Sequence, residues 1–420
     1  MNLDVQTWLP AEFFRENRRK FMEQMVQGSI AVFHAAQPVI ASADLFHHFI
    51  QAPNFFYLTG IEAPDCVLML HPASRNEERE TLFIPKPDPQ REIWTGRMLD
   101  KDEVSEISGV DKVQYMDDFE GKFVREQQPL EYLYTDYEDE GFRYPTSESG
   151  EFRRKVQNEL PGLRIKKANP ILADLRRIKS PQEISLIRRA VEITGEALQA
   201  VWTECRSDRW EYQLEAVIAY HFISNGARKY AFAPIMASGA SSTVLHYVAN
   251  ESQLEDGEVL LTDVGAKFLH YCADITRTVP VNSRFSGRQR DVYQAVLEVQ
   301  RALIQSVKPG IHVDELNATA RDLIGEKLID LELVGETEEV NEYYMHRVSH
   351  FLGLDAHDVG TYTGVLEPGC VLTIEPGIYI REEGLGVRIE DDLLVTEEGC
   401  EVLSAGIAKE PSELEALVHG

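Results

Sequence analysis

The feature that most constrains this chain is a set of carboxylates placed within short apolar stretches of its second half. Asp263 and Asp274 lie in LLTDVGAKFLHYCADITRTVPV, and Glu375 and Glu390 lie in VLTIEPGIYI and GVRIEDDLLVT. Apolar runs of this length are typical of buried strands, and an isolated buried charge is costly in free energy. A positive partner must therefore meet these carboxylates, and a pair of metal ions is the best candidate.

The two aspartates are expected to meet through a hairpin. Strands are predicted at 258–268 and 271–281, joined by a tight turn at Leu269–His270. Side chains alternate between the two faces of a strand. If the strands pair through this turn, Asp263 and Asp274 approach each other across the ladder. Two carboxylates at that distance repel, and one takes up a proton unless a cation neutralises them.

A second strand pair repeats this arrangement. The strands predicted at 371–380 and 386–396 carry Glu375 and Glu390, and His350 adds an imidazole from the stretch before them. Four carboxylates and one histidine suit two divalent ions held about 3.5 Å apart. The oxygen-rich set favours Mn²⁺, with Co²⁺ and Zn²⁺ as alternatives. Water between two such ions loses a proton near neutral pH and becomes a nucleophile, so the sequence predicts hydrolysis.

Composition restricts the partners and the compartment. The 420 residues are enough for two domains, because single cores rarely grow beyond about 250–300 residues. The net charge of −28 argues against nucleic acid and against an anionic membrane surface. The five cysteines are scattered without CxxC spacing, which excludes a disulfide framework and is typical of a reducing compartment. With no signal-peptide pattern and no apolar run of membrane-spanning length, a cytoplasmic protein is expected.

The first part of the chain predicts an α/β domain, which we expect over residues 1–170. Its apolar spacing predicts a helix over 10–25. Short buried strands are expected at 29–35, 66–72 and 80–86. The stretch 54–65, with its Gly and Pro, is expected to form turns between them. Helices and strands alternate to about residue 165, which indicates a central sheet.

The second domain is expected over 175–420. Its first helix is announced by Ser180-Pro181-Gln182-Glu183, which combines a cap, a proline at the first helical position and a capping-box glutamate. Further helices are expected at 210–225, 287–307 and 313–330. Strands at 232–239 and 244–250 precede the aspartate hairpin. A helix–helix–strand order therefore occurs twice, which hints at two related halves.

The order of these motifs resembles a known family. Two aspartates in D-x10-D, then SHFLGLDAHDVG, TIEPGIY and VRIEDD, resemble the pita-bread metallopeptidases, and most closely the Xaa-Pro aminopeptidases (aminopeptidase P). SADLFHHFIQAPNFFYLTGIEAPDCVLML and REIWTGRML resemble that family's creatinase-like first domain, and KSPQEISLIRRAVEIT resembles its linker helix. The resemblance implies an α/β (α+β) protein, with a creatinase-like N-terminal α/β domain followed by a pita-bread catalytic domain.

The resemblance assigns a role to each matching residue of the metal site. By it, five residues are metal ligands: Asp263, Asp274, His350, Glu375 and Glu390. It further implies that Asp274 and Glu390 bridge both ions. Glu375 is also expected to accept the proton of the attacking water.

The resemblance also implies contacts with the substrate. His246 and His357 match histidines that hold the substrate and stabilise the tetrahedral intermediate. His346 and Arg388 match residues around the prolyl and carboxylate end of the substrate. Arginine suits that end because its planar fork binds a carboxylate bidentately. Tyr379 is expected to help line the pocket.

Some positions depart from the family pattern. Ser241 stands where the family usually has Asn, and the segment 362–366 lacks an insertion seen in some members. Met345 and Arg347 flank His346 where Pro and Gly are common. None of these is an expected ligand, so the departures concern the substrate pocket and the preferred peptide length.

Other residues near the motifs are expected to be structural. Beside Glu390, Asp391 is expected to be a hydrogen-bonding group at a strand end, and Asp392 a solvated charge. Gly384 and Gly386 are expected to turn a hairpin. Nothing supports a phosphate-binding loop, since no GxxxxGK[ST] motif occurs.

The expected function is release of the N-terminal residue from peptides with proline in second position, by a hydroxide that bridges two divalent ions. A prolidase, which uses the same metals on Xaa-Pro dipeptides, is the alternative, and EIWTGR with the first domain's pattern favours the aminopeptidase. A metal-free creatinase-like hydrolase or a binding pseudoenzyme is disfavoured because all five ligand positions are kept. A methionine aminopeptidase usually lacks this N-terminal domain.

Trp94 matches a position that approaches a neighbouring subunit's active site in family oligomers, so a homodimer or a dimer of dimers is expected.

Overall fold

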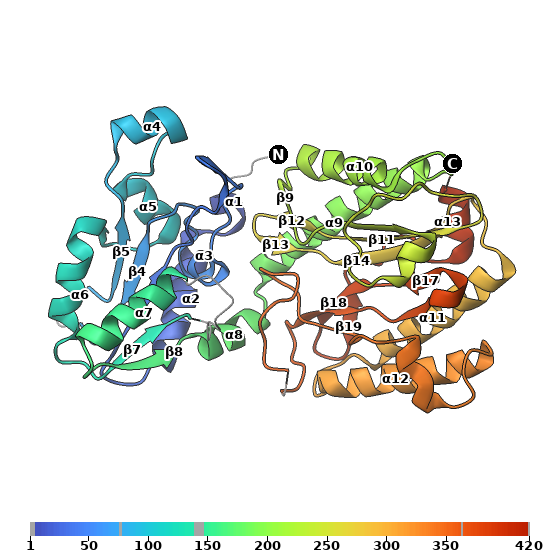
Figure 1. Ribbon diagram of the computed structural model, residues 1–420. Coiled ribbons are helices and arrows are strands. Elements are labelled where there is room, and N and C mark those ends of the chain that lie inside the picture. The colour runs from blue at the N-terminus through green and yellow to red at the C-terminus, as the bar shows by residue number, and fades with distance from the viewer. Residues whose placement is uncertain (1–4, 75–77, 138–146, 363, 419–420) are drawn as a thin grey trace. The chain divides into compact units, whose positions relative to one another are not determined.

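The structure is a computed structural model that describes residues 5–74, 78–137, 147–362 and 364–418 (Figure 1). The chain forms two compact units, an N-terminal unit of residues 2–175 and a C-terminal unit of residues 176–420. The division falls next to the boundary expected between residues 170 and 175. Within the described ranges, every helix is too short or too polar to cross a membrane.

The N-terminal unit is built on a six-stranded sheet with strand order β6-β5-β4-β1-β7-β8. Its strands are β1 (Ser29–His34), β4 (Val67–Leu70), β5 (Glu80–Ile84), β6 (Val113–Tyr115), β7 (Tyr132–Thr135) and β8 (Arg164–Lys167). The sheet is mixed, because β1 pairs antiparallel with β4 and parallel with β7. The α/β class and the strands expected at 29–35, 66–72 and 80–86 are confirmed.

Helices and one small hairpin complete this unit (Figure 1). The helices are α1 (Val5–Trp8), α2 (Ala11–Gln24), α3 (Pro53–Thr59), α4 (Pro89–Thr95), α5 (Lys101–Ser108), η1 (Met116–Asp118), α6 (Phe119–Gln127), α7 (Glu148–Glu159) and α8 (Asn169–Arg177). The hairpin pairs β2 (Ile40–Ser42) with β3 (Leu45–Phe46). Helix α2 confirms the prediction at 10–25.

The prediction of turns at 54–65 is wrong for its first half, which forms α3. Pro53 occupies the first helical turn, where its missing N–H leaves no bond unmade. Gly60 ends the helix in the left-handed conformation, with φ 70°. Phe55 and Phe56 are fully buried, so tertiary packing stabilises a helix that its short length would not.

The long helix near the start of the C-terminal unit begins where the sequence predicted it. The helix α9 (Pro181–Glu204) has the predicted capping box, because the Ser180 hydroxyl accepts from the Glu183 amide and the Glu183 carboxylate accepts from the Ser180 amide. Its other helices are α10 (Glu211–Ser224), η2 (Gly239–Thr243), α11 (Gly287–Ser306), α12 (Val313–Asp330), η3 (Thr337–Glu342), η4 (Arg381–Glu383) and α13 (Pro411–Leu417). The helices predicted at 210–225, 287–307 and 313–330 are confirmed.

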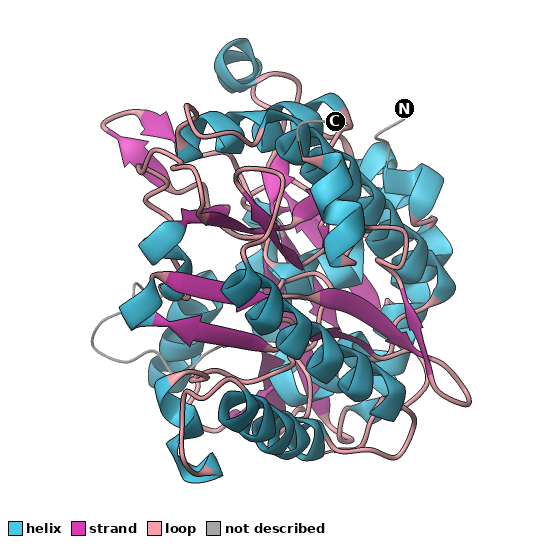
Figure 2. Ribbon diagram, turned by 90° about the vertical axis from the view of Figure 1, so that its right-hand side faces the viewer, coloured by secondary structure: helices cyan, strands magenta, loops and turns pink. Residues whose placement is uncertain are grey.

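Short antiparallel strands form the centre of this unit. They are β9 (Lys229–Tyr230), β10 (Ile235–Ser238), β11 (Val259–Val264), β12 (Ala266–Phe268), β13 (Tyr271–Cys272), β14 (Ile275–Pro280), β15 (Val371–Ile374), β16 (Gly377–Ile380), β17 (Leu385–Arg388), β18 (Asp391–Val395) and β19 (Cys400–Val402). They pair in the orders β10-β11-β14, β13-β12-β9, β15-β18-β19 and β16-β17. Figure 2, which turns this unit toward the viewer, shows helices lying across these strands.

Each long strand predicted around an acidic residue is broken into two shorter ones. Asp274 lies between β13 and β14, Glu375 between β15 and β16, and Glu390 between β17 and β18. The first hairpin breaks at Gly265, where a Cβ would lie 1.8 Å from the Ala273 carbonyl oxygen. The chain therefore changes sheets at these points, and the breaks turn acidic side chains toward a common centre.

The turn at Leu269–His270 is confirmed, since Phe268 pairs with Tyr271 across it. Both turn residues have positive φ, 42° and 74°, as a two-residue hairpin of the primed type requires. The His270 residue of this turn is buried, although turns usually lie at the surface.

The strand predicted at 244–250 is wrong, because this stretch is irregular after η2. Asn250, with φ 49°, bonds β10 through its side chain instead: its carbonyl oxygen accepts from the Met236 amide at 3.0 Å. The Tyr247 hydroxyl donates to Glu211 at 2.8 Å. Side-chain hydrogen bonds here replace the ladder that the apolar alternation predicted.

Candidate active site

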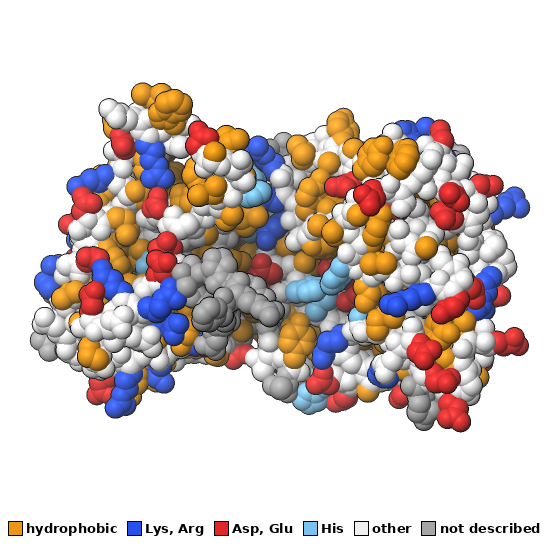
Figure 3. Space-filling model, viewed as in Figure 1, with side chains coloured by type: hydrophobic (Ala, Val, Ile, Leu, Met, Phe, Trp, Pro, Cys, Tyr) orange, Lys and Arg blue, Asp and Glu red, His pale blue; other side chains and the backbone are white. Residues whose placement is uncertain are grey.

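A cavity of about 830 Å³ opens into the C-terminal unit. Ten residues were predicted to bind metal or substrate, and nine of them line this cavity: His246, Asp263, Asp274, His346, His350, His357, Glu375, Arg388 and Glu390. Figure 3 shows histidine side chains gathered on one face of this unit. Segments as distant in sequence as 232–248 and 346–390 therefore converge on one site.

The five predicted ligands meet within bonding reach of common points. Three groups of potential ligand atoms each lie within 4.8 Å of one another: Asp263, Asp274 and Glu390; His350, Glu375 and Glu390; and Asp274, His350 and His357. Asp274 and Glu390 each belong to two of these groups. This overlap is what two ions sharing bridging carboxylates would require.

Thr276 on β14 connects the two broken strand pairs. It lies opposite Asp263 on β11, and its hydroxyl donates to Glu390 at 2.7 Å. The Glu390 amide donates to the Thr276 carbonyl at 3.1 Å. The amide of Glu375 is fixed separately, by the Val348 carbonyl at 2.9 Å. These bonds fix the side chain of Glu390 and the backbone at Glu375.

Burial and mutual repulsion both oppose the ionisation of these carboxylates. Burial, and then Glu390 and Asp263, raise the pKa of Asp274 well above its ordinary range. Burial, and then Glu375 and Asp263, do the same to the pKa of Glu390. Burial raises the pKa of Glu375 to about 8, opposed by Arg388 and reinforced by Asp263. Divalent cations would remove this cost.

Asp263 supplies an independent sign that the site suits a cation. Its Oδ2 accepts from Arg388, but its Oδ1 is buried and has no hydrogen-bond partner in the described part of the chain. A buried carboxylate oxygen without a partner is costly, and a metal ion would satisfy it. The donor set of carboxylate oxygens and one imidazole fits a divalent ion.

His350 is oriented to offer one nitrogen to this centre. Its Nδ1 lies 3.1 Å from the Phe351 carbonyl, to which it donates. Its Nε2 lies 3.5 Å from Asp274 and 3.6 Å from Glu375. Burial, and then His357, lower the pKa of His350 to about 4, so the ring is neutral and Nε2 has a free lone pair.

The other three histidines surround the cavity. His357 is exposed and its ring centre lies 4.3 Å from that of His350. His246 is also exposed, and it lines the cavity from the segment 232–248. Burial, and then Arg388, lower the pKa of His346 to about 4, and its Nε2 lies 2.8 Å from the Tyr379 hydroxyl.

Each guanidinium nitrogen of Arg388 donates one hydrogen bond within the protein. Its Nη2 donates to Asp263 at 2.6 Å, its Nη1 to the Tyr379 hydroxyl at 3.0 Å, and its Nε to Thr276 at 3.1 Å. Tyr379 is completely buried and does not belong to the cavity lining; its hydroxyl lies behind the cavity, where it joins Arg388 to His346.

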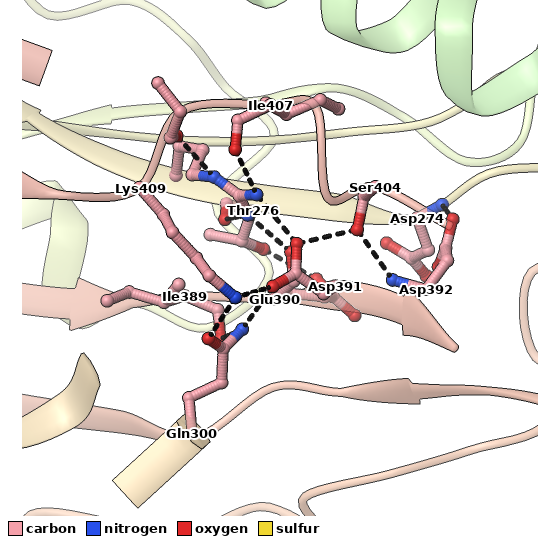
Figure 4. Close-up of polar contacts among 12 residues, drawn as sticks. Asp274, Thr276, Gln300, Ile389, Glu390, Asp391, Asp392, Ser404, Ile407 and Lys409 are labelled. Carbon is pink, nitrogen blue, oxygen red and sulfur yellow. Dashed lines mark hydrogen bonds and ion pairs between the residues drawn. The ribbon is translucent and has the colours of Figure 1, made fainter. Parts of the chain in front are cut away.

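A buried polar network that the sequence did not predict lies behind the carboxylates (Figure 4). Asp391 accepts from Arg277 at 2.7 Å, Ser404 at 2.6 Å, Gln300 at 2.9 Å and Lys409 at 2.5 Å. Burial acts to raise the pKa of Asp391, but Arg277 and Lys409 outweigh it and lower this pKa to about 2. The prediction of a hydrogen-bonding group at a strand end is confirmed, although its partners lie far away in sequence.

The prediction that Asp392 is a solvated charge is wrong. Its side chain is completely buried, and its Oδ2 accepts from the Asp274 amide at 3.1 Å (Figure 4). Burial raises the pKa of Asp392 well above its ordinary range. The strand β18 is buried along its whole length, so neither of its faces offers solvent to an aspartate.

A second network, also unpredicted, supports the segment that carries His357. Asp358, the next residue, accepts from Arg176 at 2.5 Å and from Lys179 at 3.2 Å. Arg176 also donates to Asp355 at 3.0 Å. Burial acts to raise the pKa of Asp358, but Arg176 and Lys179 hold it below its usual range. The sequence offers no local signal for this cluster, because its members are about 180 residues apart.

Comparison with known proteins agrees with this geometry. Residues 185–397 match metallopeptidase family M24, and residues 14–133 match the N-terminal domain of aminopeptidase P. The Xaa-Pro aminopeptidase of Escherichia coli (strain K12) is 35% identical, over 96% of this chain and 97% of that protein. The Xaa-Pro aminopeptidase of Haemophilus influenzae is 32% identical over the full length of both.

Solved structures give the same result. The E. coli aminopeptidase P with the inhibitor Pro-Leu superimposes with a TM-score of 0.88 at 34% sequence identity, covering 97% of this chain and 98% of that one. The agreement extends over both units, each of which also matches its own sequence family. The chain therefore belongs to metallopeptidase family M24, and it carries the N-terminal domain of aminopeptidase P.

Proposed function

We propose that this protein is an Xaa-Pro aminopeptidase, which hydrolyses the bond before a proline in second position and releases the N-terminal residue. One observation carries the proposal: four carboxylates and a histidine converge in one cavity of an M24 chain. The relatives that match nearly the whole of this chain are named for that activity.

We assign the role of metal ligand to Asp263, Asp274, His350, Glu375 and Glu390. Their overlapping groups support two ions, with Asp274 and Glu390 shared between them. Such ions, when bound, polarise a carbonyl and lower the pKa of water. The preponderance of carboxylate oxygens favours Mn²⁺ over softer ions.

The remaining cavity residues bind, orient and move protons. We assign Glu375 as the proton acceptor, because its carboxylate lines the cavity and belongs to a single group of potential ligands among the described residues. His246 and His357 are exposed to the cavity, where they can donate to an oxygen of the substrate. His346, kept neutral by burial, lines the cavity wall beside them.

A prolidase is not favoured. The relatives from E. coli and H. influenzae, which match 96% and 100% of this chain, are both named Xaa-Pro aminopeptidase. The E. coli relative holds Pro-Leu, which is the product that an aminopeptidase leaves after removing the first residue of an Xaa-Pro-Leu tripeptide. A cavity of about 830 Å³ is also large for a dipeptide alone.

The direct test compares three peptides on chelated protein, with and without added Mn²⁺. Xaa-Pro-Ala should be cleaved only with metal, and Xaa-Ala-Ala, the matched control, far more slowly. Cleavage of Xaa-Pro alone would make the protein a prolidase. Equal cleavage with Ala in second position would contradict the specificity for proline.

We also propose a homo-oligomer, in the form of a dimer or a dimer of dimers. The N-terminal unit exposes apolar side chains that a monomer would normally cover. Ile93 and Trp94 on α4 are 80% and 88% exposed, and Leu45 and Phe46 on β3 are 65% and 58% exposed. Hydrophobic side chains stand out on α4 in Figure 3. Light scattering of Trp94→Asp and Phe46→Asp should report smaller particles; an unchanged mass would contradict these surfaces.

For the domains and the compartment we propose the following. The C-terminal unit is the catalytic domain, because all cavity residues belong to it. A reducing cytoplasm is supported by the cysteines, which are all unpaired and of which only Cys400 is not buried.

A further inference from the structure

The cavity lining includes arginine side chains to which the proposed reaction assigns no role. Arg347 and Arg388 are the arginines among its described lining residues. The guanidinium nitrogens of Arg388 already donate to Asp263, Tyr379 and Thr276. Arg347 pairs instead with the exposed carboxylate of Asp314, which a bound peptide can displace.

Among the described residues, the guanidinium of Arg347 contacts one exposed carboxylate and one half-buried ring. It pairs with Asp314 at 2.6 Å, and the two side chains are 58% and 67% exposed. Such a pair contributes little, because water screens both charges. Its Cζ lies 5.7 Å from the centre of the Tyr362 ring, which lines the same cavity. A carboxylate from a ligand can replace Asp314 and leave no buried charge unpaired.

Ser349 adds an independent polar group to the same cavity. It lies two residues beyond Arg347 and also belongs to the lining. Its side chain is 1% exposed, and its hydroxyl oxygen has no hydrogen-bond partner among the residues that the structure describes. Buried hydroxyls normally have partners, so an oxygen or N–H group of a bound peptide is expected here.

We propose that Arg347 binds a carboxylate that the substrate carries beyond its proline, and that this contact sets a preference for such peptides. The inference rests on the proposed aminopeptidase function. The α-carboxylate of a tripeptide presents this group, and so does an acidic side chain in third position. Arginine binds a carboxylate through two parallel hydrogen bonds. The Pro-Leu held by the E. coli relative carries its α-carboxylate on the residue after proline.

The test measures kcat and KM for two pairs of peptides. Xaa-Pro-Ala against its C-terminal amide isolates the α-carboxylate, and Xaa-Pro-Glu amide against Xaa-Pro-Gln amide isolates the acidic side chain. The protein should favour the charged member of at least one pair by about fivefold, mainly through KM. In Arg347→Ala this ratio should fall to near one, and Arg347→Lys should keep part of it. Added KCl should also reduce the ratio.

Two further variants serve as controls. Arg301 is a similar arginine outside the cavity lining, 46% exposed and paired with Glu410, and Arg301→Ala should keep the full ratio. Asp314→Asn removes the competing carboxylate and should raise the ratio. An unchanged ratio in Arg347→Ala, or no discrimination by the unmodified protein, would overturn the inference. The proposed function fails separately, if none of the four peptides is cleaved in the presence of metal.

Discussion

The guanidinium of Arg277 lies 2.7 Å from the carboxylate of Asp391, and both side chains are completely buried. Arg277 also donates to the backbone carbonyls of Glu390 at 2.6 Å and Thr276 at 2.9 Å (Figure 4). The pair therefore joins β14 and β18, which begin directly after two of the proposed ligands, Asp274 and Glu390. A buried ion pair has a structural task here that is separate from the chemistry in the cavity.

Asp391→Asn should destabilise the protein strongly, because it leaves the buried guanidinium of Arg277 without its anion and also removes the charge partner of the half-buried Lys409. Breaking a buried pair costs about 3–5 kcal/mol, which corresponds to a fall in Tm of roughly 10 °C in a unit of this size. Glu410→Gln is the matched control, since Glu410 pairs with Arg301 at the surface and its loss should cost less than about 1 kcal/mol. Equal shifts in Tm for the two variants would contradict this account.

Asp274→Asn and Glu390→Gln should each lose bound metal and activity together. Each removes one of the two carboxylates shared between groups of potential ligands. Metal content is measured by atomic spectroscopy after dialysis, beside kcat on Xaa-Pro-Ala. A variant with full metal content and full rate would count against the assignment of its residue.

His357→Ala separates the two possible roles of that histidine. The structure brings His357 within ligand distance of Asp274 and His350, whereas the family resemblance assigns it to the substrate. We expect the variant to keep both metal ions and to lose kcat by about 100-fold, because a group that contacts the reacting oxygen contributes at that scale. A fall in metal content would instead make His357 a ligand.

The sequence predicted which carboxylates gather in the cavity better than it predicted the strands that bring them there. Asp263, Asp274, Glu375 and Glu390 were recognisable because buried carboxylates on apolar strands need a cation, wherever the strands break. The breaks themselves were not predictable. They arise because the chain changes hydrogen-bonding partners, as at Gly265, where the Ala273 carbonyl leaves no room for a Cβ.

The supporting networks were not predictable for a related reason. Asp391 bonds Gln300 and Arg277, which lie 91 and 114 residues before it in the chain. Asp392, between apolar residues and acids, gave no local sign that both faces of β18 are buried. Local pattern identifies which residues need partners, whereas tertiary structure decides which partners they receive.

The stability of the metal-free protein should fall as pH rises from about 5 to 8. Glu375 has its pKa raised from 4.5 to about 8 by burial, so the folded state favours its protonated form. Its contribution to stability is present below pH 4.5 and is lost as pH rises through about 8. Bound metal favours the ionised form and should abolish this loss. The test measures Tm of metal-free and Mn²⁺-loaded protein from about pH 5 to 8.5, with Glu375→Gln as the control variant. If Tm depends on pH in the same way with and without metal, this explanation is wrong.

Asp358 should act on catalysis through His357. It follows His357 directly and is clamped by Arg176 and Lys179, all three side chains being buried. In Asp358→Asn the clamp is weakened and the segment becomes less ordered, so we expect kcat to fall by about tenfold while KM and metal content change little. Asp355→Asn is the matched control, because Asp355 also contacts Arg176 but is 40% exposed, and its rate should stay within about twofold of the unmodified protein.

The double variant Asp358→Asn/His357→Ala tests whether Asp358 acts through His357. If it does, adding Asp358→Asn to His357→Ala should not lower kcat further. Additive losses would assign Asp358 a general structural role instead.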